Sequence, residues 1–172
     1  MMLIEAMKKL RVIEKRIESN QADITKYAAG LENEKEVFGS LEQQKKEVEA
    51  LVQSNNDLMK ESINLKLQIE YTNLNTVASI CGEKRRISEW LVIKRKYAKL
   101  MIGTYEALNS TKAKLRLTVR SGSTNDQKIV RYYDEKYKNE NILKWKNIYS
   151  EIDSSLEVIN ATTELKELPQ LQ

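Results

Sequence analysis

The single cysteine is the strongest candidate nucleophile in this sequence. Cys81 is followed by Gly82 and the basic run Lys84–Arg86. Positive neighbours lower the pKa of a thiol and so favour the reactive thiolate. A cysteine nucleophile is usually activated by a histidine base as well, and the chain contains no histidine. The sequence therefore argues against a nucleophilic role for Cys81.

Other familiar catalytic and metal-binding patterns are missing. One cysteine and no histidine exclude an intramolecular disulfide, a zinc finger and a histidine-dependent triad. No phosphate-binding glycine loop, serine nucleophile elbow or HExxH motif occurs. Carboxylate pairs such as Glu32/Glu36 and Asp134/Glu135 are spread along predicted helix surfaces rather than gathered in a cleft. We therefore expect a protein that is not an enzyme and has no cofactor or metal.

Positive charge is concentrated in the middle of the chain. Residues 84–146 carry 17 basic and 6 acidic residues, a net charge of +11, although the whole chain is only +4. Tyrosines lie in the same region, and cations beside aromatic rings are typical of surfaces that bind phosphates and stack on bases. Tyr97 and Tyr137 fall on predicted buried faces, however, which favours a structural role for them. The candidate polyanion-binding residues are Lys84, Arg85, Arg86, Lys94, Arg95, Lys96 and Lys99.

A long helix is the element around which the rest of the chain is organised. In residues 41–73, alternating steps of three and four give a narrow apolar seam. A helix of this length is about 50 Å long and cannot bury its own seam, so it needs partner helices from its own chain or from another copy. The seam comprises Val37, Leu41, Gln44, Val48, Leu51, Asn55, Leu58, Ser62, Leu65, Ile69 and Thr72.

The composition favours helices throughout. Charged residues make up 31% of the chain and aromatic residues only 6%, and the only proline is Pro169 near the end. Long exposed helices that share narrow seams have this composition. The sequence predicts an all-α fold built as long antiparallel helical hairpins, or a coiled-coil bundle.

The first helix is predicted to begin near Met2 and to end near Gly30. A turn within 30–40 would then return the chain, and Ser40–Gln43 fits a capping box at the start of the next helix. A continuous helix through Gly30 and Gly39 is the competing interpretation. The first seam comprises Leu3, Ala6, Leu10, Ile13, Ile17, Asn20, Ile24 and Tyr27.

Polar residues interrupt both seams. Asn20 lies in the first seam, and Gln44, Asn55 and Ser62 lie in the second. Buried polar residues of this kind fix helix register and oligomeric state in coiled coils. A buried ligand site is the alternative, but no set of acids or bases accompanies these residues.

The helical pattern fails after residue 73. Residues 76–81 are predicted to be extended, and residues 115–120 alternate strictly between apolar and polar. Because a strand needs a partner, these two segments are predicted to pair as a short two-stranded β element. Between them, a helix is predicted to open near Ile87, with Trp90, Leu91, Tyr97, Leu100, Met101, Leu108 and Leu115 as its apolar residues.

The last helix is predicted to follow a capping box at Thr124–Gln127 and to end near Glu164. Its seam is clearest at Ile142, Trp145, Tyr149, Ile152, Leu156, Ile159 and Thr163. The sequence thus divides into a coiled-coil hairpin over residues 1–74 and a second hairpin with a crossover segment over residues 75–172.

The order of short motifs resembles the septicolysin-like family of bacterial proteins. Ile69–Asn73 and Ile159–Leu165 are similar to two of its helix-end motifs, with Glu70 and Ala161 standing where the family has Asn and Trp. Ile87–Glu89 and Thr124–Asp126 are similar to the segments between them, and residues 2–17 look like its opening helix. The resemblance implies a helical fold of largely uncharacterised function, and the family name suggests a secreted cytolysin.

Both helix-end motifs are rich in side chains that bond to backbone groups. We therefore predict a polar layer where these helices meet the crossover segment. Its members are Thr72, Asn73, Asn160, Thr162 and Thr163.

These patterns favour a non-enzymatic, homo-oligomeric scaffold or interaction module. Nucleic-acid or polyanion binding through residues 84–146 is the first alternative, and a membrane-active, cytolysin-like protein is the second. The N-terminus includes Glu5 and lacks the uninterrupted apolar run of a signal peptide, and no apolar run is long enough to span a membrane. We therefore expect a cytoplasmic protein without a transmembrane segment.

Overall fold

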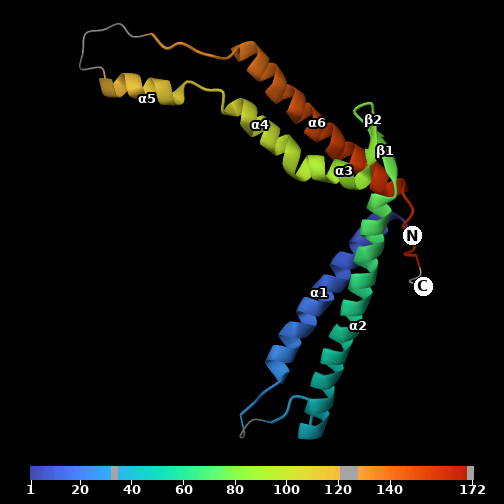
Figure 1. The fold of residues 1–172 in the computed structure, drawn as a ribbon. Coiled ribbons are helices and arrows are strands. Elements are labelled where there is room, and N and C mark those ends of the chain that lie inside the picture. The colour runs from blue at the N-terminus through green and yellow to red at the C-terminus, as the bar shows by residue number, and fades with distance from the viewer. Residues whose placement is uncertain (32–34, 121–127, 170–172) are drawn as a thin grey trace. The chain divides into compact units, whose positions relative to one another are not determined.

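The computed structural model describes residues 1–31, 35–120 and 128–169. Helices dominate, and a two-stranded antiparallel sheet is the β structure among these residues, as the predicted all-α class with a short β element requires. Figure 1 shows the elements in chain order. They are α1 (Leu3–Tyr27), α2 (Leu41–Leu74), β1 (Val77–Ile80), β2 (Glu83–Arg86), α3 (Ile87–Val92), η1 (Ile93–Tyr97), α4 (Ala98–Glu106), α5 (Thr111–Arg120) and α6 (Glu135–Thr162).

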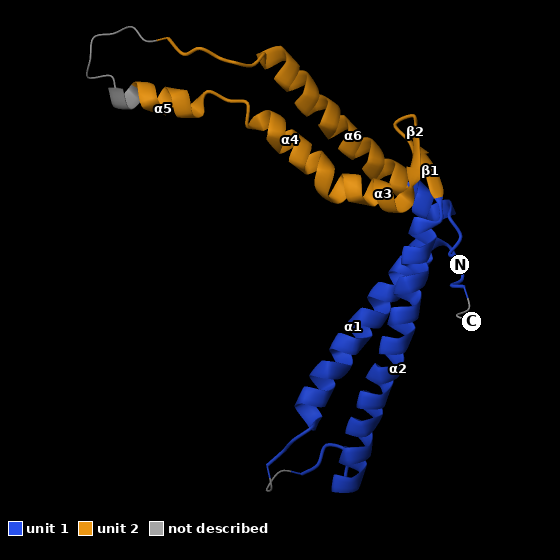
Figure 2. Ribbon diagram, viewed as in Figure 1, with its two compact units in different colours: residues 1–76, 158–172 blue, residues 77–157 orange. Residues whose placement is uncertain are grey.

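The chain divides into two compact units (Figure 2). Unit 1 combines residues 1–76 with residues 158–172, and unit 2 comprises residues 77–157. The C-terminal segment thus belongs with the N-terminal hairpin, whereas the sequence predicts that it belongs to the second hairpin.

Unit 1 is built on an antiparallel hairpin of α1 and α2 (Figure 1). Residues 28–40 connect the two helices, which confirms the predicted turn and makes the continuous-helix alternative wrong. The Ser40 hydroxyl accepts the Gln43 backbone N–H over 3.2 Å, as predicted. The Gln43 side chain donates forward to Glu47 over 2.8 Å instead of reaching back, so only one half of the capping box is present.

The two seams face each other inside unit 1. Ala6 and Ile13 of α1 form a buried cluster with Leu65 of α2, and Leu10, Ile17, Leu58, Ile69 and Leu165 pack around it. Lys9 and Glu61 add an ion pair between the helices, with a 2.7 Å contact. The inner seam of α2 is therefore filled by α1 of the same chain.

The C-terminal segment closes one end of this hairpin. The Leu3 N–H donates to the Thr163 carbonyl over 2.8 Å, and the Leu165 N–H donates to the Met1 carbonyl over 2.9 Å. Met2 and Glu164 thereby form an antiparallel bridge. Segments from the two ends of the chain therefore lie side by side in unit 1.

Unit 2 begins with a tight β-hairpin. β1 pairs with β2 from Val77 opposite Arg86 to Ile80 opposite Glu83. Cys81 (φ 53°) and Gly82 (φ 76°) occupy the two turn positions, and two successive positive φ angles are typical of a type I′ turn. The predicted extended piece at 76–81 is confirmed as β1.

The predicted strand at 115–120 is wrong, because these residues belong to helix α5. β2 follows β1 after a two-residue turn and pairs along the whole of β1. Pairing with a nearby segment closes a short loop and therefore costs less conformational entropy than pairing with a distant one. The leucine and arginine residues of 115–120 also suit a helix, since both residue types are good helix formers.

Three consecutive helical segments follow the sheet in unit 2. α3 passes directly into the π-helix η1 and then into α4. The buried residues of this run are Ile87, Trp90 and Ala98, whereas Tyr97 is 52% exposed. The expectation of a buried Tyr97 is therefore wrong. A π-helical turn contains one residue more than an α-helical turn, so the buried position shifts from 97 to 98.

α6 runs antiparallel to α3–α4 within unit 2, as shown by two contacts. Lys94 forms an ion pair with Asp153, and the rings of Tyr105 and Tyr137 meet edge to face at 6.0 Å. Tyr137 is nevertheless 54% exposed, so its predicted core position is also wrong. Ile152 and Leu156 are buried on α6, as its seam predicts.

The start of α6 differs from the prediction. The helix begins at Glu135, and the Asp134 carboxylate accepts the Lys136 N–H over 2.8 Å. The predicted capping box at 124–127 lies outside the described residues, and residues 128–134 are not helical.

Candidate interaction surfaces

Three polar positions of the α1/α2 seam, Asn20, Asn55 and Gln44, form hydrogen bonds within the hairpin. The Asn20 side chain donates to the Asn55 side-chain oxygen over 2.8 Å. The Gln44 side chain donates to the Tyr27 carbonyl over 2.8 Å. Both hydrogen bonds fix the register of α1 against α2, so the register-fixing part of the predicted role is confirmed for these residues.

A second row of apolar residues on α2 faces solvent. We call it the outer stripe, and each of its side chains is between 45% and 62% exposed. With 3.6 residues per turn, its positions fall within an arc of about 80°, centred roughly 110° from the inner seam. The outer stripe comprises Leu41, Val52, Met59, Ile63, Leu67 and Leu74.

The heptad pattern that predicts the inner seam does not reveal the outer stripe. Its signal is an exact spacing of eleven residues between Leu41, Val52, Ile63 and Leu74. Eleven residues make about three helical turns, so these four side chains recur within an arc of about 60° on one side of the helix. The inner seam follows a different register of the same helix, and the predicted seam wrongly included Leu41, which is 62% exposed.

The opposite helix of the hairpin has no comparable row. Val12 is the one large apolar residue of α1 that is strongly exposed, at 64%. The unpartnered apolar surface of the hairpin therefore belongs to α2.

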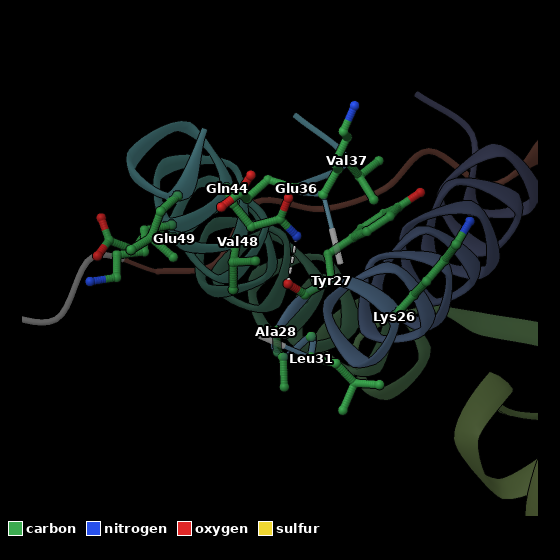
Figure 3. Close-up of a pocket in the computed structure, with 14 residues that line it drawn as sticks. Lys26, Tyr27, Ala28, Leu31, Glu36, Val37, Gln44, Val48 and Glu49 are labelled. Carbon is green, nitrogen blue, oxygen red and sulfur yellow. Dashed lines mark hydrogen bonds between the residues drawn. The ribbon is translucent and has the colours of Figure 1, made fainter. Parts of the chain in front are cut away.

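A hollow of about 770 Å³ lies at the tip of the hairpin, where α1 leads into the connection (Figure 3). Tyr27 and Gln44 line it and are joined by the hydrogen bond described above, with Leu31, Val37 and Val48 around them. Residues 32–34 of the same connection lie outside the described chain, so we assign no ligand to this hollow.

The predicted polyanion-binding residues do not form one set of free cations. Arg85 pairs with Glu83 over 2.6 Å and lies over the Trp90 ring at 5.6 Å. Lys94 is engaged by Asp153. The exposed members, with no ion pair within the described part of the chain, are Lys84 and Arg86 on β2, Arg95 and Lys96 in η1, and Lys99 on α4.

Cys81 is not activated as a nucleophile. Its backbone N–H donates to the Glu151 carboxylate over 2.9 Å. Burial, followed by a hydrogen bond between the thiol and the Glu151 carboxylate and by the negative charges of Glu151 and Glu83, raises the pKa of the Cys81 thiol to about 11. The expectation that Lys84–Arg86 would lower this pKa is therefore wrong, because a carboxylate rather than an ammonium group lies next to the sulfur.

The predicted polar layer is only partly assembled. Thr72 is fully buried, and its hydroxyl donates to the Gln68 carbonyl and accepts the Lys166 N–H over 2.9 Å. Thr163 takes part through its backbone carbonyl, as described above, whereas Thr162 is exposed and bonds to the Val158 carbonyl of its own helix. Asn160 is half-buried. Asn73 has a buried side-chain oxygen without a hydrogen-bond partner in the described structure.

No metal or membrane-spanning site is present among the described residues. They contain no cluster of three acidic or cysteine side chains that could hold a metal ion. None of the helices within these ranges has the length and apolar composition needed to cross a membrane.

Comparison with known proteins leaves the resemblance untested. Searches of protein-family models, curated proteins and solved structures found no match to this chain. The septicolysin-like resemblance therefore stays a prediction, and function has to be argued from the surfaces themselves.

Proposed function

We propose that this protein is a non-enzymatic interaction module that self-associates through the outer stripe of α2. The observation that supports it is a row of six large apolar side chains, about half exposed, along a helix whose inner seam is already filled. Contiguous exposed apolar surface of this kind marks protein–protein contact sites.

Sedimentation velocity across a range of concentrations tests this proposal. The wild-type chain should form a dimer or larger oligomer at micromolar concentration. Val52→Ser/Ile63→Ser should shift the protein to monomer while its far-ultraviolet circular dichroism stays unchanged. Val12→Ser is the matched control, because it removes an exposed valine from α1. A wild-type protein that remains monomeric at 100 µM or above would overturn the proposal.

A second candidate function is polyanion binding by unit 2. It is supported by the five exposed cations on β2, η1 and α4 that lack an ion pair in the described structure. A π-helical segment such as η1, which contains Arg95 and Lys96, is also found frequently at functional sites.

Retention on immobilised heparin measures this second function. Lys96→Ala/Lys99→Ala should lower the salt concentration of elution more than Lys8→Ala/Lys15→Ala, which removes the same charge from α1. Phosphate contacts have a steep salt dependence, so elution of the wild-type protein below about 150 mM salt would contradict polyanion binding.

A further inference from the structure

We infer that the outer stripe binds a second copy of this chain in antiparallel orientation, with the two-fold axis passing between the two copies of α2 at the level of Asp57 and Leu58. This inference rests on the proposed self-association and assigns its partner, orientation and register. It depends on how apolar and charged residues are distributed along one exposed arc of α2.

The apolar residues of the arc are self-complementary in this register. When two identical helices pair antiparallel about a two-fold axis, residues at equal distances on either side of the axis face each other. An axis between residues 57 and 58 sets Leu41 opposite Leu74 of the second copy and Val52 opposite Ile63 of the second copy.

The charged residues within the arc obey the same symmetry. Lys45 and Glu70 lie on the helix face of the outer stripe, and both are exposed. They are equally far from the axis on opposite sides and have opposite charges. Each dimer would therefore contain two Lys45–Glu70 contacts between the copies.

Neither Lys45 nor Glu70 has an ion-pair partner within the described part of its own chain. A parallel dimer would instead place Lys45 beside Lys45 and Glu70 beside Glu70, and like charges in contact select against that orientation.

The spacing of the stripe suits a long pair of helices. An apolar repeat of eleven residues corresponds to 3.67 residues per turn, which keeps the contact face nearly straight along the helix. α2 has 34 residues and is about 50 Å long. The contact would thus extend along the entire helix, on the side that α1 leaves open.

Charge reversal tests the orientation. Lys45→Glu and Glu70→Lys should each raise the dimer dissociation constant about tenfold, because each converts two attractions into two repulsions. Lys45→Glu/Glu70→Lys should restore the wild-type value, since the charges are exchanged. Lys46→Glu is the matched control, because Lys46 is the next residue but lies outside the arc, and it should leave the constant within about twofold. In a parallel dimer each single charge reversal would leave the dissociation constant nearly unchanged, and that result would overturn the inference.

Cysteine cross-linking tests the register directly. In a Cys81→Ser background, Val52→Cys/Ile63→Cys should form a disulfide-linked dimer under mild oxidation. Val52→Cys alone should not, because the two introduced cysteines would lie about 16 Å apart along the axis, beyond the reach of a disulfide. Efficient cross-linking of Val52→Cys alone would indicate a parallel dimer and would overturn the inference.

The failures of the two proposals are distinguishable. A monomeric wild-type protein overturns self-association and the antiparallel dimer together. A dimer that Val52→Ser/Ile63→Ser dissociates, but that is insensitive to Lys45→Glu, retains the outer stripe as interface and overturns only the antiparallel register.

Discussion

The side-chain amide of Asn20 donates a hydrogen bond to the side-chain oxygen of Asn55 over 2.8 Å, and both residues are half-buried between α1 and α2. The Asn20 amide also lies 3.3 Å from the Ser54 hydroxyl. Shifting one helix by a turn would separate these groups and leave polar atoms inside an apolar seam, so the pair selects one register of the hairpin.

Asn55→Leu is expected to destabilise the protein by about 1–3 kcal/mol, because it leaves the Asn20 amide without its closest acceptor. Asn20→Leu/Asn55→Leu should recover most of this loss, since both polar groups are then replaced by apolar ones. Urea unfolding followed by circular dichroism measures both effects. Asn64→Leu, at an exposed position of α2, serves as control, and an equal loss there would contradict the argument.

Thr72→Val should cost about 1–3 kcal/mol of stability, because valine keeps the buried shape but leaves the Lys166 N–H without its acceptor. Thr162→Val is a matched control, since Thr162 is exposed and bonds only within α6. Thermal unfolding of the two variants checks the difference. Equal midpoints would show that the C-terminal segment is not held by Thr72.

Alkylation of Cys81 by iodoacetamide should rise with pH to a midpoint near 11, the raised pKa of its thiol. Glu151→Gln should move this midpoint toward the ordinary value of 9.0 without reaching it, because burial remains the larger cause. A wild-type midpoint below 9 would contradict the arrangement of Cys81 beside Glu151.

The same raised pKa affects stability at alkaline pH. Between pH 9 and pH 11 the folded state binds more protons at Cys81 than the unfolded state does, so its contribution to stability falls as the pH rises. The contribution is complete below pH 9. Comparing the unfolding curves of the wild type and Cys81→Ser across this pH range separates the Cys81 contribution from those of other groups that titrate at alkaline pH.

The turn conformation of Cys81 predicts how three substitutions at this position rank in stability. Its φ of 53° lies in the left-handed region, which asparagine tolerates and β-branched residues avoid. Cys81→Asn should therefore stabilise unit 2 by about 0.5–1 kcal/mol relative to Cys81→Ala, and Cys81→Val should destabilise it by more. Thermal denaturation ranks the three variants, and Cys81→Val as the most stable of them would contradict the type I′ turn.

The elements that were predicted well depend on local chemistry. The spacing of apolar residues in α1 and α2 predicts helices. The Ser40 hydroxyl caps α2 by accepting the backbone N–H of Gln43, three residues away. The buried residues Ile152 and Leu156 of α6 follow from the same spacing. Interactions over one or two helical turns are encoded in adjacent residues, so the sequence reveals them.

The predictions that proved wrong concern features that local sequence patterns do not encode, namely the choice of a strand partner and an irregular helical turn. β1 was predicted correctly, but its partner proved to be β2 rather than 115–120, because the nearer segment closes a shorter loop. Tyr97 was misplaced because the π-helical turn at η1 shifts the register by one residue. The apolar periodicity of the sequence reveals neither the choice of strand partner nor the π-helical register shift.

The sequence by itself determined that the chain is helical, that α2 has an apolar seam interrupted by Asn55, and that the basic residues concentrate in the middle. Only the tertiary structure decided which surface fills that seam. α1 of the same chain covers Leu65, while Ile63 two residues earlier stays 54% exposed on the other side of the helix. Both residues are apolar and suit a buried face equally well, and packing of α1 against one side of α2 is what separates them.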